Sequence, residues 1–256
     1  MEINRTSLSA SHYNILMAAL ESALELSVEN VPDLGDNVWI LLDTSGSMHG
    51  PMGGRQSFGH SGYVSQGPTI KMVEMAALFA AIVFKRSATF NYNVAMTRFD
   101  TDASMLNINP RDTVLTITRN IMATRQGGAT YIWAALDLMP RLGFKPQTVI
   151  LFSDMQVDSP SMGSKYGYDT GGRNTRTLNM FGQEAMKVAF NFADGATTPA
   201  SEKDGWIQLA GYSDKVFKFI EMSRPGYANT VVQNLMAATG GQVEEEPEAE
   251  EVGDEE

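Results

Sequence analysis

Three oxygen-bearing side chains, Asp43, Ser45 and Ser47, stand at alternate positions of this 256-residue chain. One carboxylate and two hydroxyls are hard ligands, which suit Mg²⁺ with its octahedral geometry, oxygen distances of about 2.0–2.1 Å and several retained waters. A short turn of this kind leaves coordination positions open for water and for an incoming ligand. The spacing therefore predicts a divalent-cation site. An ordinary turn with Asp43 as a helix cap is the alternative that the pattern by itself leaves open.

The uninterrupted apolar run from Val38 to Leu42 leads directly into Asp43. A run of this kind predicts a strand that is buried on both faces, as in a parallel sheet covered by helices. Ligands of open α/β sheets bind at the carboxyl ends of such strands. The run therefore places the three oxygen donors at the end of the sheet where a binding site is expected.

Two later segments can bring further oxygen ligands to the same place. Gly127 and Gly128 allow a sharp turn before a helical pattern, so that the hydroxyl of Thr130 can point back toward the first loop. The apolar run in residues 147–154 ends in Ser-Asp, which predicts that Asp154 lies at the carboxyl end of another strand.

The segment Leu41 to Met48 (LLDTSGSM) resembles the metal-ion-dependent adhesion site of von Willebrand factor A domains. The segments around Thr130 and Asp154 resemble the second and third loops of that site, in the family's order. The resemblance implies an Mg²⁺ site, with Mn²⁺ or Ca²⁺ as alternatives. It further implies a partner protein that supplies an Asp or Glu to the metal. The implied direct ligands are Ser45, Ser47 and Thr130, while Asp43 and Asp154 hold the metal largely through water.

A longer segment, Ala19 to Met48, resembles the junction in Ro (TROVE) ribonucleoprotein autoantigens, where an RNA-binding helical ring leads into a C-terminal A domain. The ring has no counterpart in the residues before the first predicted strand. The formal net charge is −11, of which nine negative charges fall in residues 244–256, so the rest of the chain carries −2. A surface of this charge does not favour phosphate binding, and we expect no tight RNA binding by this chain alone.

The alternation of strand and helix patterns predicts an α/β fold, with a doubly wound, mostly parallel six-stranded sheet and helices on both faces, as in von Willebrand factor A or Rossmann-like folds. Three parts are expected: a docking helix and linker (1–35), the A-like domain (36–240) and an acidic disordered tail (241–256). The predicted helices are 9–28, 70–86, 110–124, 131–142, 175–186, 215–222 and 228–238. The predicted strands are 38–42, 92–99, 104–108, 147–154, 187–193 and 206–212, with 104–108 as an antiparallel edge strand.

Composition and motifs favour binding over catalysis. The chain has no cysteine, no apolar run of the roughly 18–20 residues that cross a membrane, and no signal-peptide pattern, so we expect a cytoplasmic protein or one in an intracellularly assembled particle. No histidine and no unpaired carboxylate has the spacing to act as a general base at a strand end, and no enzyme is expected. Loops 48–69 and 155–173 should flank the metal, with Tyr166, Tyr168 and Arg173 as candidate partner contacts.

The leading interpretation is therefore a metal-dependent protein-binding module. One alternative is a structural component of a larger particle, a ribonucleoprotein or virion, in which the metal stabilises the loops. A second alternative is an A-domain subunit that works with a separate ATPase.

Overall fold

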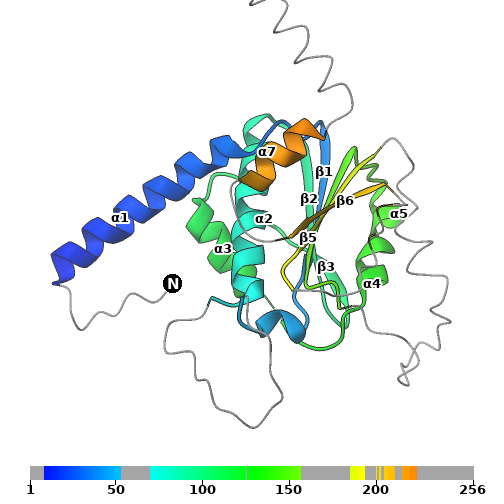
Figure 1. The fold of residues 1–256 in the computed structure, drawn as a ribbon, viewed down its shortest axis with the longest axis horizontal. Helices are drawn as coiled ribbons and strands as arrows, with labels where there is room; N and C mark the ends of the chain where they lie inside the picture. Colours follow the sequence, from blue (N-terminus) through cyan, green and yellow to red (C-terminus); the bar gives the residue numbers. More distant parts are fainter. Residues whose placement is uncertain are drawn as a thin grey trace, which may run out of the picture.

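The computed structural model describes residues 9–52, 70–124, 126–156, 185–193, 200, 202, 205–210 and 215–223. The strands form one sheet in the order β3-β2-β1-β4-β5-β6, with helices on both of its faces (Figure 1). Neighbouring strands are parallel except for β2 and β3, which are antiparallel. The bounds are β1 Asn37–Asp43, β2 Asn93–Phe99, β3 Ala103–Met105, β4 Thr148–Ser153, β5 Met186–Asn191 and β6 Trp206–Ala210. The predicted fold class and the antiparallel edge strand are confirmed.

Two apolar cores cover the sheet, and β1 contributes to both because successive side chains of a strand point to opposite faces. Val38, Ile40 and Leu42 belong to the core under α2 (Met72–Thr89), α3 (Val114–Met122) and α7 (Lys215–Met222). Trp39 and Leu41 belong to the core under α4 (Ile132–Leu136). All five side chains are almost completely buried, which is why β1 reads as a continuous apolar run.

Two helix predictions need correction. The helix expected from residue 110 begins at Val114, because the hydroxyl of Thr113 caps it by accepting a hydrogen bond from the backbone N–H of Thr116 at 3.2 Å. The helix expected over residues 131–142 is divided into α4 and α5 (Leu138–Leu142). Pro140 lacks the backbone N–H that would continue the α4 ladder through Leu136.

The helix predicted over residues 175–186 is also wrong at its end, because Met186 begins β5. The part of it before residue 185 lies outside the described residues, as do the predicted helix 228–238, Tyr166, Tyr168, Arg173 and the acidic tail. Most of the two long loops beside the predicted site lie outside them too. No helix in the described parts of the chain is long and apolar enough to cross a membrane.

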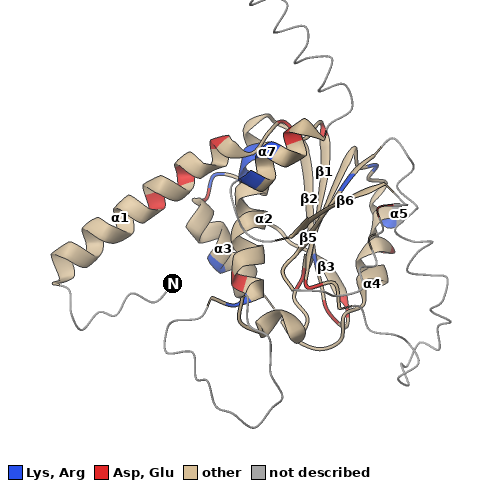
Figure 2. Cartoon of the chain, in the orientation of Figure 1, with Lys and Arg blue, Asp and Glu red and all other residues tan. Residues whose placement is uncertain are grey.

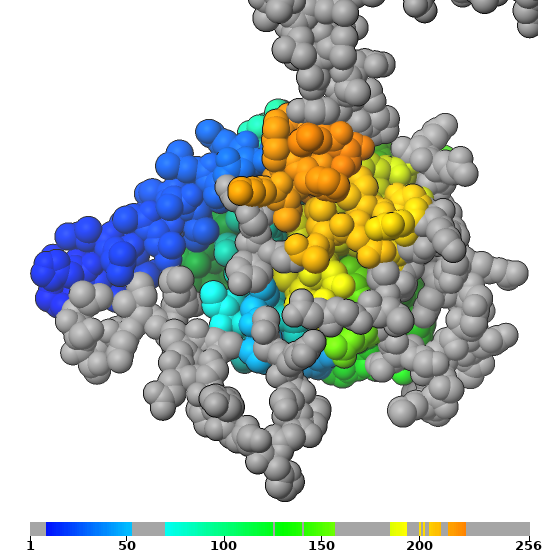
Figure 3. Space-filling view, viewed as in Figure 1, coloured from blue at the N-terminus to red at the C-terminus, as the bar shows by residue number. Residues whose placement is uncertain are grey.

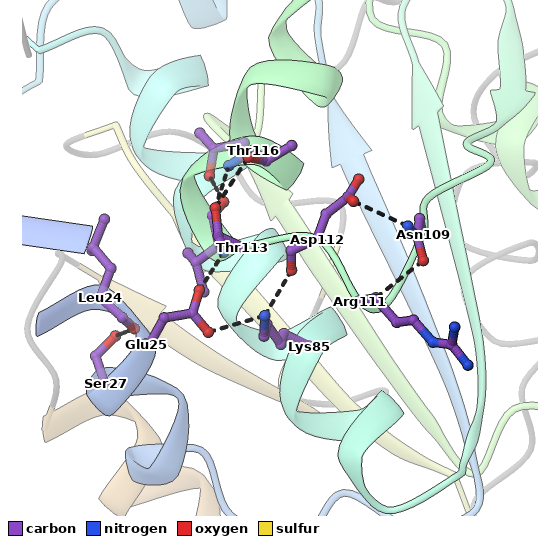
Figure 4. Close-up of polar contacts among 11 residues, drawn as sticks. Leu24, Glu25, Ser27, Lys85, Asn109, Arg111, Asp112, Thr113 and Thr116 are labelled. Carbon is purple, nitrogen blue, oxygen red and sulfur yellow. Dashed lines mark hydrogen bonds and ion pairs between the residues drawn. The ribbon is translucent and has the colours of Figure 1, made fainter. Parts of the chain in front are cut away.

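The first helix, α1 (Ala10–Ser27), contacts the rest of the molecule through its C-terminal half and is followed by η1 (Val28–Asn30). Leu24 packs against the core of α2 and α3. Glu25 forms an ion pair with Lys85 at 3.0 Å and accepts a hydrogen bond from the backbone N–H of Val114 at 2.7 Å (Figure 4). A carboxylate at the amino end of α3 is favourable for the helix dipole, so Glu25 fixes α1 to both helices.

The N-terminal half of α1 is less covered. Ile15 and Leu16 are 64% and 43% exposed, and the helix projects from the remainder of the described chain (Figure 3). An apolar cavity of about 360 Å³ separates part of α1 from α2 and α3, with Met17 and Leu20 in its lining. The apolar ridge of α1 therefore packs against the core at Leu24, and not along its whole length as its pattern predicts.

Candidate metal centre

The predicted site lies where the strand order of the sheet reverses. From β1 the chain first adds β2 and β3 on one side, and then returns to place β4 on the other side of β1. Such a switch point leaves a crevice at the carboxyl ends of the two strands, where ligands of α/β sheets bind. Asp43 is the last residue of β1, and Asp154 directly follows β4, so both predicted carboxylates lie at this switch point.

The first loop is organised by the carboxylate of Asp43, which is completely buried. Its Oδ1 accepts a hydrogen bond from the backbone N–H of Ser45 at 2.9 Å, and its Oδ2 accepts one from the hydroxyl of Ser153 at 2.6 Å. Ser45 Oγ lies 3.2 Å from Ser47 Oγ, at the start of η2 (Ser47–His49). Asp43 therefore joins the backbone of the first loop, at Ser45, to the end of β4, at Ser153.

The third loop begins with the buried carboxylate of Asp154. Asp154 Oδ1 accepts a hydrogen bond from the backbone N–H of Gln156 at 3.1 Å, and Ser153 Oγ accepts one from the backbone N–H of Met155 at 2.9 Å. Met155 has a φ of +60°, in the left-handed region that bulky side chains rarely adopt. Such backbone outliers cluster at functional sites, and this one turns the chain immediately after Asp154.

The second loop is tied to the first by a reciprocal pair of backbone hydrogen bonds. Gly127 N–H donates to the carbonyl of Thr44 at 2.7 Å, and Gly46 N–H donates to the carbonyl of Gly128 at 3.0 Å. Both glycines of the second loop have positive φ, +102° and +97°, which favours glycine at these positions. Thr130, which is 4% exposed, follows two residues later. The structure thus brings the loop of Thr130 against the loop of Ser45.

The pKa of Asp43 is raised from 3.8 to about 7, chiefly by burial and in smaller part by the Asp154 carboxylate, while the hydrogen bonds from Ser153 and Ser45 act in the lowering direction. Acidic residues gather at this end of the sheet, beside α4 (Figure 2). Two buried carboxylates close together disfavour each other's charged form, and a bound cation inverts that preference.

The residues present fit a hard cation. The predicted set contains two carboxylates and three hydroxyls and no nitrogen or sulfur, which is the ligand chemistry of Mg²⁺ and not of zinc. Within the described residues no group of three or more His, Cys, Asp and Glu side chains could hold a metal, so a site here depends on the hydroxyls.

Two residues of the site were not predicted. Ser153 ends an apolar run, and its position directly before Asp154 is the signal that could have indicated a role beside the metal. Thr101, in the turn between β2 and β3, accepts a hydrogen bond from the backbone N–H of Ala129 at 3.0 Å. Nothing in the local sequence indicates that contact, because the two residues come from different loops.

No family model matches the chain, and no curated protein matches it. Among solved structures, the Ro (RSR) protein of Deinococcus radiodurans is similar, with a TM-score of 0.53 and 18% identity over 82% of this chain. Proximal thread matrix protein 1 from the mussel byssus has a TM-score of 0.42 and 13% identity over 74% of this chain.

An aerotolerance-related membrane protein from Bacteroides fragilis has a TM-score of 0.42 and 16% identity, over 73% of this chain and 98% of that one. The chain spans 38% of the length of the Ro protein and 47% of the byssus protein. At these identities the likeness to the Ro protein concerns the fold, a six-stranded, mostly parallel α/β sheet.

Proposed function

We propose that this chain is a divalent-cation-dependent protein-binding module and not an enzyme. Its binding site is a metal-ion-dependent adhesion site of the von Willebrand factor A kind. The residues that form it are Asp43, Ser45, Ser47, Thr130 and Asp154. One observation carries the proposal: the buried Asp43 carboxylate is hydrogen-bonded to the first loop and to the end of β4, at the switch point of the sheet.

Each residue has a distinct role in this proposal. Ser45, Ser47 and Thr130 supply neutral hydroxyl ligands, while Asp43 and Asp154 supply negative charge and hold the metal largely through water. Bound Mg²⁺ supplies the positive charge that attracts a carboxylate of the partner protein. Because the direct protein ligands are neutral hydroxyls and the two carboxylates act through water, the metal still attracts a negative ligand, which is the reason to expect an Asp or Glu in the partner's contact surface.

The first test is a calorimetric titration of Mg²⁺ into the wild type and into the double variant Asp43→Ala with Ser45→Ala. The variant is expected to lose Mg²⁺ binding and to keep a cooperative thermal melt, since both residues lie at the edge of the core. Asp36→Ala is the matched control, because Asp36 is an exposed carboxylate next to the opposite end of β1. Equal Mg²⁺ affinity in wild type and double variant would exclude the site.

The second test concerns the partner. Immobilised chain is exposed to candidate partners in Mg²⁺ and in EDTA, with the double variant in parallel. Capture that disappears both in EDTA and in the variant supports a metal-bridged carboxylate contact. Capture that persists in EDTA would contradict it and would favour the structural role in a larger particle.

A further inference from the structure

The turn between β2 and β3, Asp100 to Asp102, holds the backbone on both sides of Thr130. On the N-terminal side of Thr130, the N–H of Ala129 donates to Thr101 Oγ1 at 3.0 Å. On its C-terminal side, the N–H of Tyr131 donates to the carbonyl of Asp100 at 2.9 Å. Both neighbours of the proposed ligand Thr130 are therefore hydrogen-bonded to the same turn.

The second loop also lies directly on this turn. A Cβ atom added at Gly128 would overlap the hydroxyl of Thr101, with the rest of the Thr101 side chain 3.5 Å away. Gly128 has a φ of +97°, so both its conformation and its close approach require glycine. The distance between the loop and the turn is thus set by the Thr101 side chain and by the absence of a side chain at Gly128.

The turn is itself rigid. Asp100 N–H donates to the carbonyl of Asp102 at 2.8 Å, and Asp102 N–H donates to Asp100 Oδ1 at 3.0 Å. Arg98 Nη1 lies 3.2 Å from Asp100 Oδ1 and 2.9 Å from Asp102 Oδ1, and both Arg98 and Asp100 are buried. The ion pairs therefore connect the turn to the end of β2.

We propose that Thr101 is a positioning residue, which fixes the hydroxyl of Thr130 and thereby makes the site selective for Mg²⁺ over Ca²⁺. The inference rests on the proposed metal function. Mg²⁺ demands near-ideal octahedral geometry at about 2.0–2.1 Å, whereas Ca²⁺ accepts about 2.3–2.6 Å and irregular arrangements. Loosening one ligand therefore weakens Mg²⁺ binding more than Ca²⁺ binding.

The test compares Thr101→Val, which keeps the shape and removes the acceptor, with Thr101→Ser, which keeps the hydroxyl. Calorimetry with Mg²⁺ and with Ca²⁺ should give about a tenfold loss of Mg²⁺ affinity in Thr101→Val, the scale expected for an outer-shell partner. Ca²⁺ affinity should fall less, and Thr101→Ser should retain both. Thr101 is exposed, so these changes leave the cores intact.

Thr113→Val is the matched control, because it removes the hydroxyl that caps α3 and that contacts Thr116. It should lower the melting temperature and leave the ratio of Mg²⁺ to Ca²⁺ affinity unchanged. Gly128→Ala displaces the Thr130 loop through a change in the loop itself, and it should lower the ratio of Mg²⁺ to Ca²⁺ affinity as Thr101→Val does. It is the variant to use if Thr101→Val fails to melt cooperatively.

The outcomes separate the two proposals. A wild type that binds neither cation would overturn the proposed function. A wild type that binds Mg²⁺, with an unchanged affinity ratio in Thr101→Val and Gly128→Ala, would overturn the positioning role and leave the metal site standing.

Discussion

Two pairs of carboxylates lie at the same end of the sheet, and they differ in whether a positively charged side chain of the protein compensates their charge. Beside β2, the buried Asp100 and the half-exposed Asp102 share the guanidinium of Arg98, at 3.2 and 2.9 Å. Beside β1 and β4, Asp43 and Asp154 are both completely buried. The interactions that set the pKa of Asp43 are burial, hydrogen bonds and the charge of Asp154, and no positive charge is among them.

Under the proposed function, this difference separates a structural pair, Asp100 and Asp102, from a pair that binds the cation, Asp43 and Asp154. Burying a charge is costly unless it is paired, and Arg98 provides that pairing within the fold. The pKa of Asp43, raised to about 7, shows that its neighbours do not stabilise its charged form in the same way. A cation from solution would take the place that Arg98 has in the other pair.

The largest expected effect tests the internal pair. Arg98→Met should lower the free energy of unfolding by about 3–5 kcal/mol, because it leaves the Asp100 carboxylate buried without its cation. Asp43→Asn is the comparison, and without metal it should be neutral or stabilising. Urea unfolding of both variants in EDTA measures the two values. Similar losses in the two variants would remove the distinction between the pairs.

The second effect is the pH dependence of the metal-free protein. The pKa of Asp43 is about 7 in the folded chain, against an ordinary value of 3.8 for an aspartate in water, so the unfolded chain releases this proton first. The contribution of Asp43 is therefore complete below pH 4 and is lost as the pH rises through 7. Between about pH 5 and 8 the wild type should lose on the order of 3 kcal/mol relative to Asp43→Asn.

Thermal melts of wild type and Asp43→Asn in EDTA, at about pH 5 and pH 8, measure this difference. Added Mg²⁺ should restore the wild type at the higher pH and should have little effect on the variant. If the stability of the two proteins changed with pH in the same way, the pKa of Asp43 would not be raised by folding, and the contrast between the two carboxylate pairs would be wrong.

A smaller change in the free energy of unfolding is expected for variants of Gly127 and Gly128, whose loop contacts both the Asp43 loop and the turn of Asp100 to Asp102. Gly128→Ala should cost roughly 1–3 kcal/mol, since it combines a φ of +97° with the overlap on Thr101. Gly127→Ala should cost about 1 kcal/mol, because its φ is +102° and no atom lies within 4 Å of an added Cβ. Chemical unfolding distinguishes them, and equal costs would argue against close contact between the loop and the turn.

The smallest effect concerns Asp102, whose side chain is 52% exposed in its ion pair with Arg98. Solvent screens such a pair, so Asp102→Asn should change the free energy of unfolding by less than about 1 kcal/mol. A double-mutant cycle with Arg98→Met measures the coupling. If the coupling energy between Asp102 and Arg98 equalled that between Asp100 and Arg98, the two carboxylates would contribute equally to the ion pair with Arg98.

Much of the fold could be predicted from local pattern. The apolar runs predict β1 and β4 to within a few residues, and the short segment after Asp102 is correctly expected as an antiparallel edge strand. Helix boundaries were less predictable. The start of α3 depends on the cap formed by Thr113, and the division near Leu136 depends on a proline four residues later in an otherwise helical pattern.

The sequence by itself determined which oxygen donors follow the ends of β1 and β4, because that follows from the order of neighbouring residues. It therefore supplied Asp43, Ser45, Ser47 and Asp154 as candidates, and the glycine turn before a helical pattern supplied Thr130. The tertiary structure decided their environment. The Ser153 hydroxyl reaches Asp43 across 110 positions of the chain, and Thr101 reaches Ala129 across 28. Burial and hydrogen bonding depend on which distant segments meet, so the raised pKa of Asp43 and the support of the Thr130 loop exist only once the sheet has assembled.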